Sequence, residues 1–366
     1  MLSIPPIPRK KRLGFFSRLL DDAPAGERYR LVTEQIAHAE ALGFDSAWVA
    51  QHHFHENEGG LPSPLVFLAH VAQRTQRIRL GTGVVTLTME NAIRVAEDAA
   101  VLDLLSGGRL EVGLGTGGTA ESFEAFGVDG GERGAVFGRN LQRLRAAWRG
   151  EVLPGGVRVY PQAPQLLQRL WQATFSVEGA RRAGAAGEGL MLSRTQPRPD
   201  QAPGLSLSGI QNPIIDAYLA ALPLGAAPRI LGSRTLFVAD RREEALHWAE
   251  IGLRRLALRH AGALAGPSSA GLFARVDPQA PLEQLIAAYD VHLGTPGDVI
   301  ASLQADTALA RATDLVFQVH SIDPPHQAIL RSLELTASVV APALGWAGPP
   351  GTACASTAAE PALHAA

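Results

Sequence analysis

Residues 77–118 read RIRLGTGVVTLTMENAIRVAEDAAVLDLLSGGRLEVGLGTGG, and this stretch decides the fold. Residues 78–87 form an apolar run rich in β-branched residues, which is typical of a strand buried on both faces. From Asn91 to Leu105 the apolar residues recur at helical spacing; Asn91 suits the N-cap, and glycines follow the last turn. Residues 109–115 return to a strand pattern. A strand, a helix and a second strand joined this tightly predict a parallel crossover unit.

The same alternation of strands and helices extends along the chain in both directions. Strands are predicted at 12–16, 44–50, 78–87, 109–115, 169–176, 189–193, 233–239 and 314–319. Helices are predicted at 27–42, 63–76, 91–105, 132–148, 177–186, 214–222, 241–260 and 327–340. This pattern favours the α/β class and a single (β/α)8 TIM barrel, with loop and helical insertions in the C-terminal half. We expect the barrel at 12–345, an N-terminal extension at 1–11 and a disordered tail at 346–366.

The composition indicates a globular protein with a large core, since the 366 residues are 46% hydrophobic and only 19% charged. The only lysines are Lys10 and Lys11, and we interpret the basic run at 9–12 as a solvated strand flank rather than a nucleic-acid patch. Cys354 is the sole cysteine, which excludes intrachain disulfides and zinc sites with several Cys ligands. No membrane span or secretory signal is recognisable, so we expect a cytoplasmic protein without membrane or nucleic-acid partners.

Polar residues follow many of the predicted strands, at the end of a barrel where chemistry is expected. The candidates are His52, His53, His55, Thr82, Thr86, Thr116, Ser176, Arg194 and His320. An imidazole at this rim can donate or accept a proton near neutral pH. A second interpretation is a metal-dependent hydrolase, because His53 and His55 form a His-x-His pair. The metal-hydrolase interpretation needs further ligands. A centre of two metals bridged by a lysine is excluded, because the chain has no lysine beyond Lys11.

The segment GLGTGG at 113–118 has the G-x-G-x-x-G spacing of a dinucleotide-binding motif. A dinucleotide motif should open a helix at once, whereas the next convincing helix starts near Glu132, and three strands precede the segment. We therefore interpret it as a ledge of backbone N–H groups that can approach an anionic or flat ligand closely.

The stretch 81–117, together with VAQHHF at 49–54, resembles the luciferase-like family of flavin-dependent monooxygenases. The shared features are a Gly-Thr strand end, a helix with an Arg-x-x-Glu-Asp pattern and a Ser-x-Gly-Arg turn into the next strand. HLGTPGDVIASL at 292–303 resembles the Gly-Thr-Pro helix start near the end of the family's barrel. The resemblance covers roughly residues 12–345 and implies the same (β/α)8 fold.

The resemblance implies which residues lie against the ring of a flavin. His52 matches the first histidine of the family's Glu-His-His-Phe strand end, which faces the flavin, and Gln51 stands in place of the glutamate. Gly83 and Val84 match the strand end at which the family places a cis peptide bond beneath the ring. We therefore expect His52 to be the catalytic proton-handling residue and the Gly83–Val84 bond to be cis.

The resemblance also implies a site for the cofactor phosphate. Thr116 falls where the family carries a phosphate-binding arginine, and Gly118 belongs to the adjoining glycine ledge. Ala173 and Ser176 match phosphate-binding backbone and hydroxyl positions, although Ser176 also suits a plain helix N-cap. Arg194 is a candidate replacement cation, with a structural salt bridge as the alternative.

The function implied by the resemblance is monooxygenation of a small organic substrate by O2 and FMN, used as FMNH2 from a separate flavin reductase. We expect a homodimer without a metal. Two alternatives keep the barrel: an F420-dependent oxidoreductase, and a flavin-binding barrel without catalysis.

Overall fold

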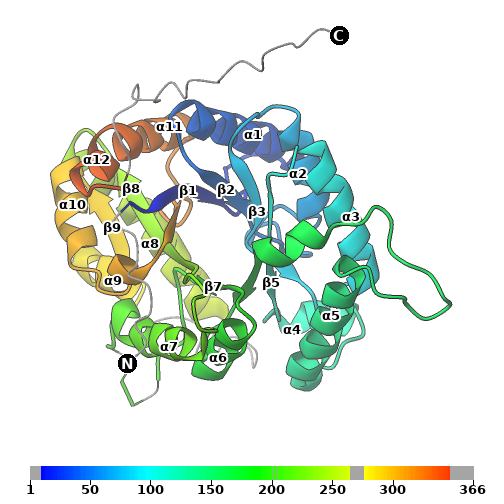
Figure 1. Cartoon of the computed structure of the whole chain (residues 1–366). Helices are drawn as coiled ribbons and strands as arrows, with labels where there is room; N and C mark the ends of the chain where they lie inside the picture. Colours follow the sequence, from blue (N-terminus) through cyan, green and yellow to red (C-terminus); the bar gives the residue numbers. More distant parts are fainter. Residues whose placement is uncertain (1–9, 200, 203, 264–275, 347–366) are drawn as a thin grey trace, which may run out of the picture.

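Eight parallel strands close into a barrel in the computed structural model, which describes residues 10–199, 201–202, 204–263 and 276–346 (Figure 1). In ring order they are β1 (Arg12–Ser17), β2 (Ser46–Val49), β3 (Arg79–Thr82), β5 (Leu110–Gly115), β6 (Leu170–Ala173), β7 (Gly189–Leu192), β8 (Ile230–Val238) and β10 (Asp314–Gln318). The ring closes because β10 pairs with both β8 and β1. The TIM-barrel prediction is confirmed.

Helices surround the strands on all sides (Figure 1). The longer ones are α1 (Ala25–Ala41), α2 (Pro64–Ala72), α3 (Ala92–Leu105), α5 (Arg133–Trp148), α6 (Val177–Ala185), α7 (Leu207–Ala221), α8 (Arg242–Ala263), α10 (Pro296–Gln304) and α11 (His326–Leu335). Shorter ones are α4 (Ala120–Ala125), α9 (Leu282–Ala288) and α12 (Ala341–Ala343). Asn91 caps α3 as predicted, since its side chain accepts hydrogen bonds from the N–H groups of Ile93 and Arg94.

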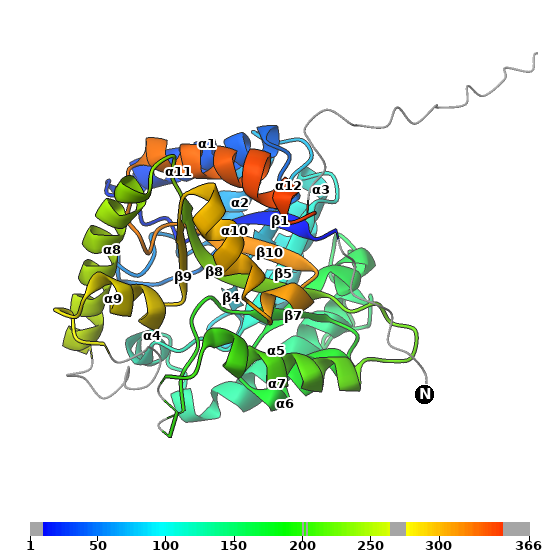
Figure 2. The ribbon, with the colours of Figure 1, turned by 90° about the vertical axis from the view of Figure 1, so that its left-hand side faces the viewer.

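The sequence pattern did not predict two short strands as elements of their own. β4 (Val85–Thr86) follows β3 after the Gly83–Val84 peptide bond, which is cis as expected, and pairs with β5. β9 (Val291–Gly294) lies outside the ring and pairs with the last residues of β8. β9 packs with α8 and α9 on one flank of the barrel (Figure 2).

α7 begins seven residues earlier than predicted, at Leu207 rather than 214, with Pro213 inside it. The Ser206 side chain accepts a hydrogen bond from the Gly209 N–H and so caps the new start. Buried side chains then recur at helical spacing through Tyr218, and their burial outweighs the helix-breaking effect of a single proline.

Large side chains fill the inside of the barrel. The rings of Trp48 on β2 and Trp171 on β6 meet edge to face, with centroids 5.8 Å apart. Gly81 and Gly189 make room for them, because a Cβ at either glycine would lie 2.2 Å from an indole carbon. The lumen is therefore a packed core, and ligand chemistry is confined to its ends.

One expectation about the chain start is wrong. Lys11 is only 7% exposed, and its ammonium donates to the carbonyl oxygens of Ala310 at 2.8 Å and Ala312 at 2.6 Å. It therefore ties β1 to the loop before β10 instead of lying in a solvated flank. Residues 1–9, most of the predicted tail and Cys354 lie outside the described residues. Among the helices that are described, none is long and apolar enough to span a membrane.

Candidate active site

The parallel ring brings the carboxyl ends of its strands to one end of the barrel. That end collects the predicted candidates His52 after β2, Thr116 after β5, Ser176 after β6 and Arg194 after β7. It also collects residues that sequence reasoning did not single out, above all Arg18 directly after β1.

His52 is held by Arg18. The Arg18 Nε donates to the His52 Nε2 at 3.3 Å, so Nε2 is an acceptor and the proton of the neutral ring is on Nδ1. Gly59 packs against the ring, since a Cβ there would lie 2.6 Å from the His52 Cδ2. Burial lowers the pKa of His52 well below its ordinary 6.5, and the charges of Arg18 and Arg194 add to this. Near neutral pH, His52 is a neutral imidazole that can accept a proton.

Gln51 stands where the family has a glutamate, and the carboxylate nearest to it in this structure is that of Glu90, to which it is hydrogen-bonded. The Gln51 Nε2 donates to the Glu90 carboxylate at 2.8 Å, while its Oε1 accepts from the Thr86 N–H at 2.7 Å. The Glu90 charge acts on His53, although burial has the larger effect and lowers the pKa of His53. Glu90 therefore supports Gln51 and His53, and it is not among the groups that perturb the pKa of His52. No sequence pattern marks Glu90.

The metal-hydrolase alternative finds no ligand set here. The His53 ring packs edge-on against Phe126, with centroids 4.8 Å apart, and His55 is exposed. His320 is buried and pairs with Asp21 at 3.1 Å between its Nε2 and the carboxylate. In the part of the chain that the structure describes, no three His, Cys, Asp or Glu side chains gather as metal ligands would.

The loop after β5 offers free backbone donors. The N–H groups of Gly117 and Gly118 bond to no residue that the structure describes. Gly117 has a φ of +73°, and a Cβ there would lie 2.6 Å from the Thr86 Cγ2, so the close turn requires glycine. At Gly118 a Cβ would meet nothing within 4 Å, which leaves this side of the loop open. The Thr116 carbonyl accepts from the Thr88 hydroxyl at 2.9 Å, which holds the loop.

The start of α6 lies beside this loop, because β5 and β6 are paired neighbours and Ala173 ends β6. The exposed Ser176 is the N-cap of α6, with its Oγ accepting from the Gly179 N–H at 3.1 Å. The N-cap interpretation is thus confirmed. A helix N-terminus with a hydroxyl, next to free N–H groups from a neighbouring loop, provides donors that fit a phosphate.

Arg194 lies on another side of the barrel end. It is 7% exposed, and its Nε donates to the Gln318 Oε1 on β10 at 3.0 Å. A second N–H donates to the Thr235 hydroxyl on β8 at 3.4 Å. No carboxylate among the described residues pairs with it, so this part of the chain does not show the salt bridge of the predicted alternative. Its guanidinium reaches toward β8 and β10 rather than toward Ser176.

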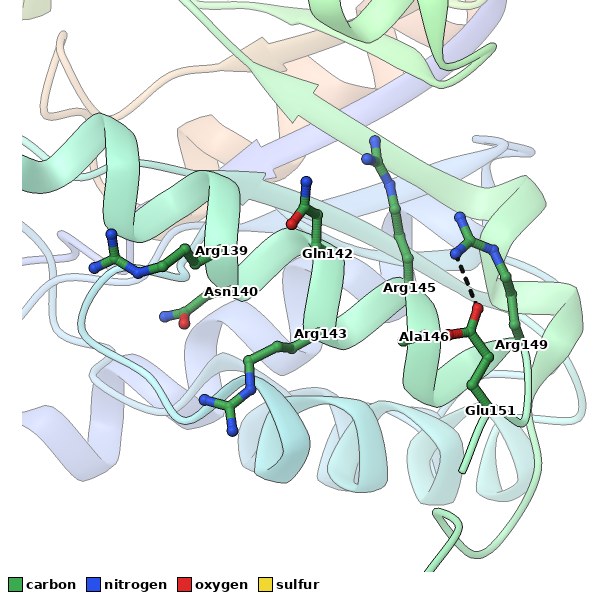
Figure 3. Close-up of a pocket in the computed structure, with 8 residues that line it drawn as sticks. All are labelled: Arg139, Asn140, Gln142, Arg143, Arg145, Ala146, Arg149 and Glu151. Carbon is green, nitrogen blue, oxygen red and sulfur yellow. Dashed lines mark hydrogen bonds and ion pairs between the residues drawn. The ribbon is translucent and has the colours of Figure 1, made fainter. Parts of the chain in front are cut away.

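Two surface hollows lie on the outer helices and contain none of these residues. One runs along α5 and is lined by Arg139, Asn140, Gln142, Arg143, Arg145, Ala146, Arg149 and Glu151 (Figure 3). The other lies between α1 and α2. The strand-end residues remain the candidate site, because they combine buried charge, free backbone donors and a perturbed histidine.

The fold is a (β/α)8 barrel, and these strand-end residues form its candidate site at the carboxyl end of the strands. Residues 14–311 match the family described as luciferase-like monooxygenase. The 4-hydroxyprotoasukamycin monooxygenase of Streptomyces nodosus subsp. asukaensis is 27% identical over 315 residues, 83% of each chain. The limonene 1,2-monooxygenase of Rhodococcus erythropolis is 32% identical over 178 residues, 45% of this chain and 44% of that protein. The chain belongs to the luciferase-like monooxygenase family, whose members are oxidoreductases.

Other relatives match over shorter parts. Two uncharacterised proteins of Sinorhizobium fredii are 35% and 40% identical over 44% and 34% of this chain, which spans 48% and 36% of their lengths. The oxygenase component of a flavin-dependent trigonelline monooxygenase of Acinetobacter baylyi is 28% identical over 42% of this chain and 44% of its own.

Solved structures share the whole barrel. The monooxygenase RslO1 of Streptomyces bottropensis has a TM-score of 0.73 at 25% identity, over 91% of this chain and 99% of its own. The oxygenating constituent of 3,6-diketocamphane monooxygenase of Pseudomonas putida, in complex with FMN, has a TM-score of 0.71 at 18% identity. The match covers 91% of this chain and 98% of that one. An F420-dependent secondary alcohol dehydrogenase in complex with an F420-acetone adduct has a TM-score of 0.67 at 17% identity. The match covers 92% of this chain and 99% of that one. At these lower identities the likeness concerns the fold.

Proposed function

We propose that the chain is the oxygenase of a two-component system, which binds FMN in its reduced form and uses O2 to oxygenate a small organic substrate. One structural observation carries the cofactor assignment. The free N–H groups of Gly117 and Gly118 lie on the loop beside the Ser176-capped start of α6, and together they supply donors for a phosphate. The named monooxygenases among the relatives support the reaction class.

The proposed ring site lies between the phosphate donors and His52. Thr116, Gly118, Ala173 and Ser176 would hold the phosphate, while Gly83 and Val84 would lie against the flavin ring. Bound reduced flavin supplies the electrons for oxygen activation. The protein holds His52 neutral through burial and the adjacent positive charges, so its imidazole is ready to accept a proton from the substrate or from water.

A separate reductase is part of this proposal. The relative from Acinetobacter baylyi is named as an oxygenase component, which is the naming of a protein that works with a second component. We expect this chain, mixed with FMN and NADH alone, not to oxidise NADH, and to need an added flavin reductase for turnover. Steady NADH oxidation by the purified chain would contradict this part.

The F420-dependent oxidoreductase is the second candidate, because the same barrel is found with an F420 adduct bound. Two relatives, at 27% and 32% identity, are named monooxygenases, which favours FMN. A barrel that binds flavin without catalysis is the third candidate. It predicts FMN affinity equal to that of the monooxygenase but no turnover with any reductase and substrate.

Fluorescence titration with FMN, riboflavin and F420 tests the cofactor assignment. We expect FMN to bind markedly tighter than riboflavin, since riboflavin lacks the phosphate. Ser176→Ala removes one hydroxyl and should weaken FMN by about 1 kcal/mol while leaving riboflavin unchanged. Ser338→Ala is a matched control, because that exposed serine bonds to the Glu334 carbonyl on α11, far along the chain from this site. Equal affinity for FMN and riboflavin would overturn the phosphate site, and tighter binding of F420 would favour the second candidate.

A further inference from the structure

Two arginines at the carboxyl end of the barrel form no ion pair with a carboxylate of the residues that the structure describes. Arg18 donates to the His52 ring and to the Glu58 backbone carbonyl. Arg194 donates to the Gln318 amide and the Thr235 hydroxyl. All four acceptors are neutral, and neither guanidinium forms an ion pair with a carboxylate of the residues that the structure describes.

Other arginines that are shielded from water either pair with a carboxylate or use most of their donors. The Arg234 guanidinium pairs with the Asp306 carboxylate at 2.6 Å, and Arg198 pairs with Asp290. Arg109 lacks a carboxylate but donates to five oxygens, four of them backbone carbonyls, as a structural clamp does. A guanidinium has five N–H donors, and Arg194 uses only two of them. Arg18 and Arg194 therefore differ from the structural arginines in both charge balance and free donors.

The two charges act in the same place. Arg18 follows β1 and Arg194 follows β7, and only β8 and β10 separate these strands in the ring. Burial, with the Arg18 charge, lowers the pKa of Arg194 to about 9. Burial lowers the pKa of Arg18 to about 10, although the nearby Glu58 carboxylate acts in the opposite direction. Both stay protonated near neutral pH. Burial lowers the pKa of His260 to about 4, and both arginines contribute. Like charges that form no ion pair are costly to bury, and a ligand that supplies a paired anion would offset this cost.

We propose that Arg18 and Arg194 form a subsite for a carboxylate of the organic substrate, next to His52. A planar guanidinium fork matches a carboxylate and binds it through paired, charge-assisted hydrogen bonds. The cofactor phosphate is the other source of an oxyanion, but its proposed donors lie on the β5 and β6 side, whereas Arg194 reaches toward β8 and β10. The identification of this ligand as the substrate rests on the proposed function, whereas the carboxylate site itself does not.

The test titrates the full-length, FMN-loaded protein with benzoate and acetate, and with benzamide and acetamide as neutral counterparts of the same shape. Thermal unfolding and the flavin absorbance report binding. We expect saturable effects from at least one carboxylate and none from its amide. Arg18→Gln and Arg194→Gln should each weaken carboxylate binding by about 10-fold or more, as loss of a charged hydrogen bond does.

Arg139→Gln is the matched control. Arg139 is an exposed arginine in the hollow along α5, with no partner among the described residues, and its loss should leave carboxylate binding unchanged (Figure 3). Arg194→Lys keeps the charge but not the fork and should bind carboxylate more weakly than the native protein yet better than Arg194→Gln. In the absence of any ligand, Arg194→Met should raise the melting temperature, because it removes an unbalanced buried charge.

Three outcomes would overturn the proposal. The first is the absence of a saturable carboxylate effect in the native protein. The second is an Arg194→Gln variant that loses affinity for FMN but not for riboflavin, because that result assigns the charge to the phosphate. The third is a lower melting temperature in Arg194→Gln, Arg194→Lys and Arg194→Met alike, because that result indicates a structural role for Arg194. The carboxylate titration is repeated without FMN, with thermal unfolding as the readout. A protein that binds carboxylate but not flavin would refute the proposed function and leave the carboxylate site standing.

Discussion

At the scale of single residues, His52 is defined by its neighbours. A histidine next to two guanidinium groups and largely shielded from water has no stabilising partner for a positive charge. Its pKa in the folded chain lies below that of the unfolded chain, so the unfolded chain binds the proton first as the pH falls. His52 therefore contributes stability that is present above pH 6.5 and is lost as the pH falls toward its lowered pKa.

The protonation of His52 can be measured directly. Nuclear magnetic resonance of the labelled imidazoles should show one histidine, assigned through His52→Gln, that stays neutral at a pH well below 6.5. Arg18→Gln removes one of the two nearby charges and should raise this pKa, whereas Arg139→Gln should not change it. A His52 that titrates at 6.5 or above in the native protein would show that its surroundings are not as described.

How much of the site the sequence could predict differs from residue to residue. His52 and Ser176 stand at a predicted strand end and helix start, and the family resemblance selects them from the other polar residues there. Arg18 and Glu90 carry no local mark. Arg18 meets His52 across 34 positions and Glu90 meets Gln51 across 39, so each pair forms only because neighbouring strands of the barrel lie side by side. The partner of Arg194 is still more distant, at 124 positions.

At the scale of elements, glycines in the strands allow close packing that a sequence pattern cannot show. A Cβ at Gly113 on β5 would lie 2.2 Å from the Thr82 carbonyl oxygen and 2.6 Å from the Met191 Sδ. The carbonyl belongs to the backbone of a neighbouring strand and cannot move aside cheaply. Gly138 on α5 is the opposite case, since a Cβ there would meet nothing within 4 Å.

This contrast predicts opposite effects of the same substitution. Gly113→Ala should lower the free energy of unfolding by about 1–3 kcal/mol through overpacking. Gly138→Ala should raise it by up to about 1 kcal/mol, because alanine favours an exposed helix interior over glycine. Urea denaturation monitored by circular dichroism gives both values. A Gly113→Ala protein as stable as the native one would mean that β3 and β5 do not pack as closely as described.

The elements themselves were predicted best where the periodic pattern was long. All eight ring strands were expected, because each is bounded by a helix and a turn signal. β9 was missed since four residues, VHLG, are too few to show a period, and because its pairing with the end of β8 lies outside the ring. The sequence predicts α7 from 214 onward because Pro213 and the glycines before it are typical of a loop, whereas the burial of the stripe from Leu207 to Tyr218 is visible only in the structure.

At the scale of the whole molecule, two neighbouring helices carry several exposed apolar side chains. Val66 on α2 and Val101, Leu104 and Leu105 on α3 are 73%, 45%, 64% and 53% exposed, on two helices that contact each other. Apolar groups gathered on adjacent helices favour an isologous dimer contact. We propose that the expected homodimer forms here.

Analytical ultracentrifugation tests the dimer. The native protein should sediment as a dimer, and Leu104→Glu should shift it toward the monomer, because a charge would then be buried opposite its copy. Leu258→Glu on α8 is the control, since that leucine is 55% exposed on a different flank. A native monomer at micromolar concentration, or a dimer unaffected by Leu104→Glu, would contradict this surface assignment.

The central claim is that FMN binds at the carboxyl end of the barrel with its phosphate between the β5 loop and the start of α6. A crystal structure of the protein with FMN tests this most directly. We predict phosphate oxygens within hydrogen-bonding distance of the Gly117 or Gly118 N–H and of the Ser176 hydroxyl, with the ring against Gly83 and Val84. Flavin bound in the hollow along α5, or a phosphate held by Arg18 and Arg194 instead, would contradict the account.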